Sequence, residues 1–206
     1  MKLTILYDNE AFLNDLKSDW GFSCFIEKKG VPNILFDTGA DGSILLSNME
    51  RLNIDPSSID DVFISHFHHD HVGGLSELLK VNKNVKIWLP HPIDRFNSAM
   101  EVNVLSSPIK IYKDVWSTGE LEGIEQSLCV ETEEGVVVIT GCSHPKMESI
   151  LSSCSRFGSL YGIVGGLHGT KPKSLRGLDL ICPTHCTKCE GTPSLLTFVR
   201  EEGASM

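Results

Sequence analysis

Residues 65–74 of the chain read SHFHHDHVGG, with four histidines and one aspartate inside six positions. The run follows the apolar segment DDVFIS (residues 60–65), which predicts a buried strand, and it ends in two glycines that allow a tight turn into a helix. Imidazole is the commonest metal ligand among protein side chains. The stretch therefore predicts a metal site at the end of a buried strand.

The spacing inside this stretch favours two metal ions over one. His66 and His68 are two residues apart, so their side chains point the same way in extended chain. Asp70 and His71 are adjacent and face a different point, which suits a second ion about 3.5–4 Å from the first. His69 is out of phase with both pairs. The alternative is an exposed polar loop whose histidines bind nothing.

Strand-like and helix-like segments alternate along the chain, which predicts an α/β layered fold in one domain over residues 1–206. Predicted strands lie within residues 2–7, 22–30, 33–39, 60–66, 85–90, 109–116, 136–144, 160–168 and 179–186. Predicted helices lie within residues 41–54 (capped by Asp41), 73–80, 146–157, 172–178 and 193–202. Residues 124–141 predict a β-hairpin that turns at Glu134 and Gly135. The pattern is weak between residues 92 and 123.

Four of these predicted strands end in a histidine. His66, His144, His168 and His185 each come just after an apolar strand. Ligand sites of α/β sheets gather at the carboxyl ends of strands. We therefore expect the four imidazoles at one rim of the fold.

Composition argues against several classes of partner. The chain has 206 residues, with 18 Lys and Arg against 27 Asp and Glu and a net charge of −9, which disfavours a nucleic-acid surface. No apolar run reaches the length of a membrane span, and the first residues, MKLTILYDNE, lack the features of a signal peptide. Seven cysteines without regular spacing suit reduced thiols. These features predict a cytoplasmic protein that acts on a small molecule, without a nucleic-acid or membrane partner.

The last cysteines leave an alternative open. Cys182, Cys186 and Cys189 form C-x3-C-x2-C around His185, which could hold a separate zinc ion or iron–sulfur cluster. The spacing matches no standard zinc pattern. The favoured interpretation is that Cys142 and Cys182 are small buried residues at strand ends, while Cys186 and Cys189 lie on a loop and are sensitive to oxidation.

SHFHHDHVGG resembles the H-x-H-x-D-H signature of the metallo-β-lactamase superfamily. LFDTGADGSILLSNME, VVVITGCSHP, GIVGGLHG and CPTHCT are similar to its other motifs, in the form found in the dihydropterin-ribofuranosyl-aminobenzene-phosphate synthase-like branch. The resemblance implies a four-layer αββα sandwich with two divalent metal ions at one rim. Zinc is the expected metal, and iron, manganese and magnesium are the alternatives. It also implies that His66, His68 and His144 bind one metal, that Asp70, His71 and His185 bind the other, and that Asp37 orients the histidine loop. For Asp37, a purely turn-forming role is the alternative.

The chain departs from the family at one motif. Many relatives have an aspartate that bridges both metals where this chain has His168 in VGGLHG. A neutral imidazole has one free lone pair and cannot bridge two cations as a carboxylate does. His168 then ligates one metal, acts beside the metals as a general acid or phosphate-binding group, or is an ordinary polar residue. Without a bridging carboxylate the second metal should bind more weakly, so a one-metal state is also open.

The resemblance implies a metal-dependent hydrolase that uses a metal-activated water, with Asp70 as proton acceptor and His168 as a second catalytic group. A small phosphoester is the preferred substrate class. The alternatives are an iron-dependent oxidoreductase of the sulfur dioxygenase kind and a non-enzymatic metal-binding or sensor protein. The short chain and its weakly patterned segment indicate an open site, or one completed by the second subunit of a homo-oligomer.

Overall fold

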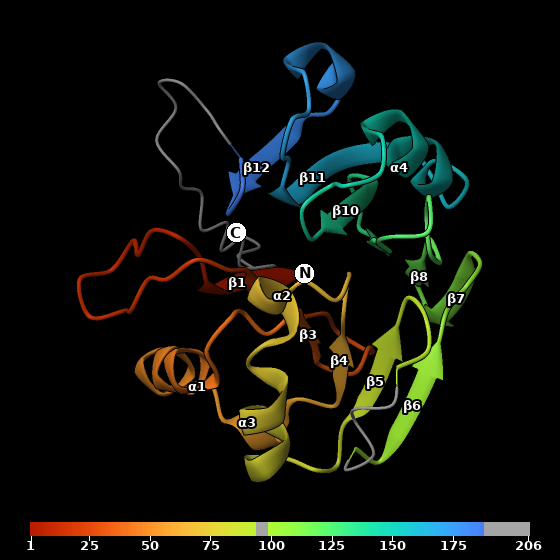
Figure 1. Ribbon diagram of the computed structural model, residues 1–206. Coiled ribbons are helices and arrows are strands. Elements are labelled where there is room, and N and C mark those ends of the chain that lie inside the picture. The colour runs from red at the N-terminus through yellow and green to blue at the C-terminus, as the bar shows by residue number, and fades with distance from the viewer. Residues whose placement is uncertain (94–98, 188–206) are drawn as a thin grey trace, which may run out of the picture.

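Two six-stranded sheets form the centre of the computed structural model, which describes residues 1–93 and 99–187 (Figure 1). The first sheet contains, in spatial order, β1 (Lys2–Tyr7), β2 (Ser23–Glu27), β3 (Ile34–Phe36), β4 (Asp61–Phe63), β5 (Lys86–Leu89) and β6 (Glu101–Val104). The second contains β12 (Leu180–Thr184), β11 (Leu160–Gly166), β10 (Val136–Thr140), β9 (Leu128–Glu131), β8 (Val115–Ser117) and β7 (Ile109–Tyr112).

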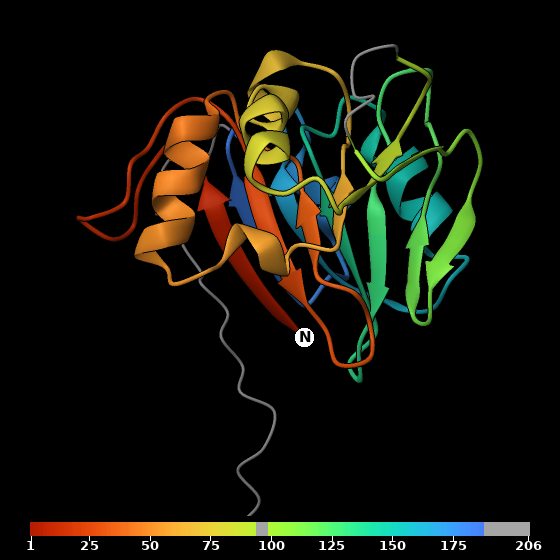
Figure 2. The same cartoon turned by 90° about the horizontal axis from the view of Figure 1, so that it is seen from below.

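Helices cover the outer faces of both sheets. They are α1 (Gly42–Arg51), α2 (His69–Val72), α3 (Leu75–Val81) and α4 (Met147–Cys154), with 3₁₀ turns η1 (Pro56–Ser58) and η2 (Pro172–Leu175). Helices α1 and α3 pack on the first sheet, in front of the strands in Figure 2, and α4 packs on the second. The result is the predicted four-layer αββα sandwich. Among the described residues, no helix has the length and apolar character needed to cross a membrane.

Side chains that alternate along the strands build the separate cores. In β3, Ile34 and Phe36 face the second sheet, whereas Leu35 between them faces the helices. The Phe36 ring stacks on that of Phe63 in the neighbouring strand, with 5.4 Å between centroids. Because both faces of these strands are covered, they consist almost entirely of apolar residues, as the sequence shows.

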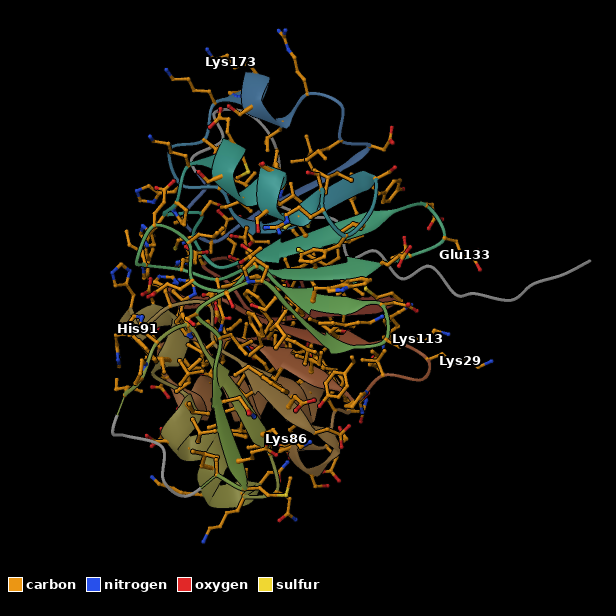
Figure 3. All side chains as sticks on the ribbon, turned by 90° about the vertical axis from the view of Figure 1, so that its right-hand side faces the viewer. Lys29, Lys86, His91, Lys113, Glu133 and Lys173 are labelled. Atoms are coloured by element: carbon orange, nitrogen blue, oxygen red, sulfur yellow. The ribbon has the colours of Figure 1, made fainter. Side chains whose placement is uncertain are left out.

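Parallel strands in both sheets direct their following loops to one edge. Strands β3 to β6 are mutually parallel, and so are β10, β11 and β12. Figure 3 shows His91, just after β5, on the side of the molecule opposite the turns that carry Lys29, Lys113 and Glu133. The edge that holds His91 therefore collects the loops at the carboxyl ends of the central strands.

Most predicted elements are present, and the departures have local causes. The predicted strand 109–116 is two antiparallel strands, β7 and β8, because Asp114 adopts a left-handed conformation (φ 61°) and reverses the chain. Strand β6 was not predicted, since this edge strand is largely exposed and lacks an alternating pattern. The predicted helix 172–178 is only the 3₁₀ turn at Pro172–Leu175. The predicted helix 193–202 lies outside the described residues.

Removing the cap of α1 provides a test of local stability. The Asp41 carboxylate accepts a hydrogen bond from the backbone N–H of Ser43 at 2.7 Å, as predicted for an N-cap. We expect Asp41→Ala to lower the free energy of unfolding by about 1 kcal/mol in chemical denaturation. Glu50→Ala, which removes an exposed acid from the same helix, is the control. Equal effects of the two substitutions would contradict the capping role.

Candidate metal centre

Three histidine nitrogens from two loops converge at the rim. His66 and His68 follow β4, and His144 lies between β10 and α4. His68 Nδ1 lies 3.1 Å from His66 Nε2 and 3.2 Å from His144 Nε2. Two nitrogens that bind one tetrahedral zinc at about 2.0–2.1 Å are separated by roughly 3.3 Å. The three residues therefore have the spacing needed to hold one metal ion, and we call them the first triad.

A second group lies beside it. Asp70 Oδ2 is 3.2 Å from His185 Nε2 and 3.9 Å from His71 Nε2. His185 Nε2 is buried, and its 3.2 Å contact with Asp70 Oδ2 lacks the geometry of a hydrogen bond. A buried polar atom without a partner is costly, and a metal ion bound there would satisfy it. These three residues, the second triad, thus fit a second metal. The rings of His66 and His71, one from each triad, are 4.1 Å apart between centroids.

Asp37 orients ligands of both triads. Its fully buried carboxylate lies 2.7 Å from His71 Nδ1 and accepts hydrogen bonds from the backbone N–H and the hydroxyl of Ser65, both at 2.7 Å. Because the Ser65 hydroxyl donates to Asp37, its oxygen is left to accept from His66 Nδ1 at 2.9 Å. Both imidazoles then present the Nε2 lone pair to the site. Asp37 makes the contacts expected of an orienting residue.

The electrostatics of the centre favour the metal-binding form of His66 and Asp70, whereas they favour the protonated form of His71. Burial, together with charge on the neighbouring histidines, holds the pKa of His66 far below its ordinary value, so its ring is neutral. Burial alone would raise the pKa of Asp70, but the adjacent His185 ring and the charge on His71 lower it well below its ordinary value. Burial also opposes the charged form of His71, yet the Asp37 carboxylate outweighs it and raises the pKa of His71.

Glu125 is a site residue that sequence reasoning missed. It is completely buried in the segment that leads into β9, and its carboxylate organises the loop that carries His144. It accepts hydrogen bonds from the Thr140 hydroxyl (2.9 Å) and from the backbone N–H groups of Gly141 (2.9 Å), Cys142 (3.1 Å), Ser143 (3.2 Å) and His144 (3.0 Å). Linear spacing gives no signal for this role, since the acid and its loop meet only when β9 pairs with β10.

The loop after β1 holds the second triad and was also missed. Asn9 Oδ1 lies 2.9 Å from His185 Nδ1, and Asn9 Nδ2 donates to the His185 carbonyl at 2.9 Å. The His185 N–H donates to Asp8 Oδ1 at 2.8 Å, and Trp20 Nε1 donates to Asp70 Oδ2 at 2.9 Å. The only signal in the sequence is the polar pair Asp8 and Asn9 after β1. This pair does not show which distant histidine it contacts.

Comparison with known proteins agrees with this geometry. A family model described as the metallo-β-lactamase superfamily matches residues 21–128, just over half of the chain and the part that contains the histidine stretch. The chain belongs to the metallo-β-lactamase superfamily.

Relatives within this superfamily differ in what they do. The chain is 28% identical to the 7,8-dihydropterin-6-methyl-4-(beta-D-ribofuranosyl)-aminobenzene-5'-phosphate synthase of Methanocaldococcus jannaschii, over 89% of this chain and 86% of the relative. The crystal structure of Tm1679, a metal-dependent hydrolase of the β-lactamase superfamily, superposes with a TM-score of 0.74 over 91% of this chain and 89% of that one. The two sequences are 28% identical. Human tRNase Z, short form, shares the fold at 15% identity, with a TM-score of 0.61 over 90% and 92% of the two chains.

His168 lies near the centre but belongs to neither triad. Its side chain is exposed, and its ring centroid is 5.4 Å from that of His144. The structure therefore does not bring it to a metal-binding position, in contrast to the ligand role considered from the sequence. No candidate metal group among the described residues includes His69 or His91 either.

Two cysteines approach the ligands. Cys142 is buried as predicted, but its Sγ lies 3.2 Å from His71 Nε2. A hydrogen bond with Cys142 outweighs burial and, with a further hydrogen bond to His168, lowers the pKa of Cys186 to about 5. Cys182 packs in the core between the sheets, and the described groups that could hold a metal do not use it. Cys189 lies outside the described residues, so the proposed three-cysteine site stays untested.

A groove of about 440 Å³ adjoins the first triad. Its walls come from the loop and helix after β10 and from the segment after β11, and they include His144 and His168. Three lysines also line it, Lys146, Lys171 and Lys173, against one acid, Glu148. In a chain with a net charge of −9, this is a locally basic surface.

Glu125→Gln tests whether the buried carboxylate positions His144. The amide has one acceptor oxygen, so its NH₂ group must oppose one of the N–H donors of the loop. We expect the free energy of unfolding to fall by about 1–3 kcal/mol and metal affinity at the first triad to fall about 10–100-fold. Isothermal titration with zinc and denaturation measure the two effects. Glu122→Gln is the matched control, and unchanged zinc affinity in Glu125→Gln would contradict the positioning role.

Proposed function

We propose that the protein is a metal-dependent hydrolase that acts on a small phosphorylated ester. The observation that carries the proposal is the basic groove that opens from the first triad. A metal centre would activate water, and the lysines of the adjacent groove would bind an anionic group of the substrate.

The two triads would each hold one divalent cation. When bound there, the cations lower the pKa of a coordinated water towards neutrality and stabilise negative charge that develops on the substrate. The protein supplies the orientation: Asp37 fixes His66 and His71, Glu125 fixes the loop of His144, and Asn9 fixes His185.

Asp70 is our candidate for the proton acceptor. Its lowered pKa keeps the carboxylate ionised, and Trp20 and His185 hold Oδ2 in place. His168 lines the groove together with the lysines and His144, and its side chain is exposed. From there its ring can donate a hydrogen bond or a proton to a phosphate or leaving-group oxygen, which is the second of the three roles considered from the sequence.

A transfer reaction is the second candidate. The relative from Methanocaldococcus jannaschii is named as a synthase whose product carries a 5'-phosphate. The basic groove would serve the phosphate of such a compound equally well. Hydrolysis and transfer are separated by the products: a hydrolase releases an alcohol and phosphate in water, whereas a transferase consumes the phosphorylated compound only when an acceptor is added. An iron-dependent oxidoreductase would consume oxygen instead.

Metal content is the first test. Elemental mass spectrometry of protein purified without chelators or a histidine tag should find about two equivalents of metal per chain. His144→Ala should lose about one equivalent and phosphodiesterase or phosphomonoesterase activity while circular dichroism stays unchanged. His69→Ala, from the same histidine stretch, is the control and should keep both. Full activity and full metal content in His144→Ala would contradict the assignment of His144 as a metal ligand. If the bound metal is iron, oxygen consumption should be measured as well.

The groove lysines are tested by substrate charge. Lys171→Ala should raise KM for a phosphorylated ester about fivefold, equivalent to about 1 kcal/mol for a partly exposed charge contact, and leave kcat nearly unchanged. The effect should shrink at high salt and be absent for an uncharged ester. Lys113→Ala is the control, since Lys113 does not line the groove and lies on the side of the molecule opposite His91 (Figure 3). Equal KM values for Lys171→Ala and Lys113→Ala would contradict a phosphate role for the groove.

A further inference from the structure

The two triads contain little negative charge for two divalent cations. Asp70 is their only anionic member, and the five histidines are neutral ligands. His66, His71 and His185 are buried, so solvent cannot screen the excess positive charge well. His168 is outside both triads, and an imidazole supplies no negative charge. An anionic group between the two metal positions is therefore expected on electrostatic grounds.

The Cys142 thiol lies close to ligand atoms of both triads. Its Sγ lies 3.2 Å from His71 Nε2, and it lies within 4.8 Å of ligand atoms of both His66 and His71. It also lies within 4.8 Å of the ligand atoms of His185 and Cys186. Sulfur and nitrogen ligands of one tetrahedral zinc are separated by roughly 3.5 Å, from bond lengths of about 2.3 and 2.0–2.1 Å. Cys142 Sγ thus has the spacing of a shared-zinc ligand to His71 of the second triad and lies within 4.8 Å of the ligand atom of His66 in the first.

The backbone around Cys142 is built for this close approach. A Cβ at Gly141 would meet Ser65 Oγ at 2.2 Å and His66 Nδ1 at 3.1 Å. A Cβ at Gly166 would meet the Gly141 carbonyl oxygen at 2.6 Å and Cys142 Cα at 3.2 Å. Glycine on both sides lets the loop lie against the histidine stretch, and Glu125 holds the Cys142 N–H at 3.1 Å. The position of the thiol is therefore fixed by its surroundings.

We propose that Cys142 Sγ is a thiolate ligand shared by the two metal positions, in place of the bridging carboxylate at whose motif position this chain has His168. The proposal rests on the metal site of the proposed function and adds a ligand to it. On binding, the S–H bond breaks, the proton leaves to solvent, and the sulfur lone pairs bind the cations. A thiolate has more than one lone pair, so it can contact both ions. Its softness selects zinc or iron over magnesium and manganese.

X-ray absorption at the zinc edge of the zinc-loaded protein tests this directly. We expect a sulfur scatterer at about 2.3 Å from zinc in the unmodified protein. Replacement of zinc by cobalt should add a near-ultraviolet thiolate-to-cobalt charge-transfer band. In Cys142→Ser, both signals should disappear and bound metal should fall from about two equivalents to about one, while thermal unfolding of the metal-free protein stays unchanged.

Two further variants make the outcome specific. Cys186→Ser, the other thiol at the rim, should keep the sulfur signal and both metals. Cys142→Asp should restore two metals without sulfur, because its carboxylate returns a bridging anion. Two results would overturn the proposed role of Cys142 and leave the proposed function intact. One is metal bound without any sulfur scatterer in the unmodified protein, and the other is a sulfur signal that survives in Cys142→Ser. A failure to bind metal after loading overturns the proposed function as well.

Discussion

A single buried carboxylate, Asp37, ties the end of one strand to the histidine stretch that follows the next. Its two oxygens hold the Ser65 backbone and hydroxyl and the His71 ring, and through Ser65 they reach His66. A buried charge is tolerated only when its hydrogen bonds are complete, so this network accepts little variation in geometry. The orientation of two imidazoles, one in each triad, depends on it.

The second sheet has a matching device. Glu125, also fully buried, collects the backbone N–H groups of the loop between β10 and α4, and this loop carries His144 and Cys142. Each sheet therefore uses one internal acid to shape one loop, and the two loops meet where the sheets face each other. The hydrogen bond between the Gln126 amide and the Ile64 carbonyl, at 2.8 Å, joins the sheets beside this meeting point. The contacts that pack the two sheets together therefore also position the loops of the site.

Charge is divided unevenly over the molecule. The chain as a whole is acidic, yet lysines line the groove beside the first triad. An acidic protein repels anions at long range, so a local cluster of cations next to a metal centre favours a small anionic group over an extended polyanion. The substrate that we propose, a small phosphorylated ester, matches this distribution of charge.

Short-range patterns in the sequence determined a large part of this protein. Short apolar runs predicted most strands, Asp41 predicted the start of α1, and the spacing of His66, His68, Asp70 and His71 predicted two ligand pairs at a strand end. These features depend on neighbours a few residues apart, where backbone geometry decides which side chains share a face. The edge strand β6 was not predicted, because a largely exposed strand has no pattern of alternating apolar and polar residues.

Only the tertiary structure decided which distant residues complete the site. Glu125, Asn9 and Trp20 contact the ligands or their loops from other parts of the chain, and His168 stands outside the triads despite its place at a strand end. Cys142 was expected to be an ordinary buried residue, and its approach to His71 depends on two glycines that let separate loops touch. Local patterns carry no information on such contacts, because they arise from how two sheets pack face to face.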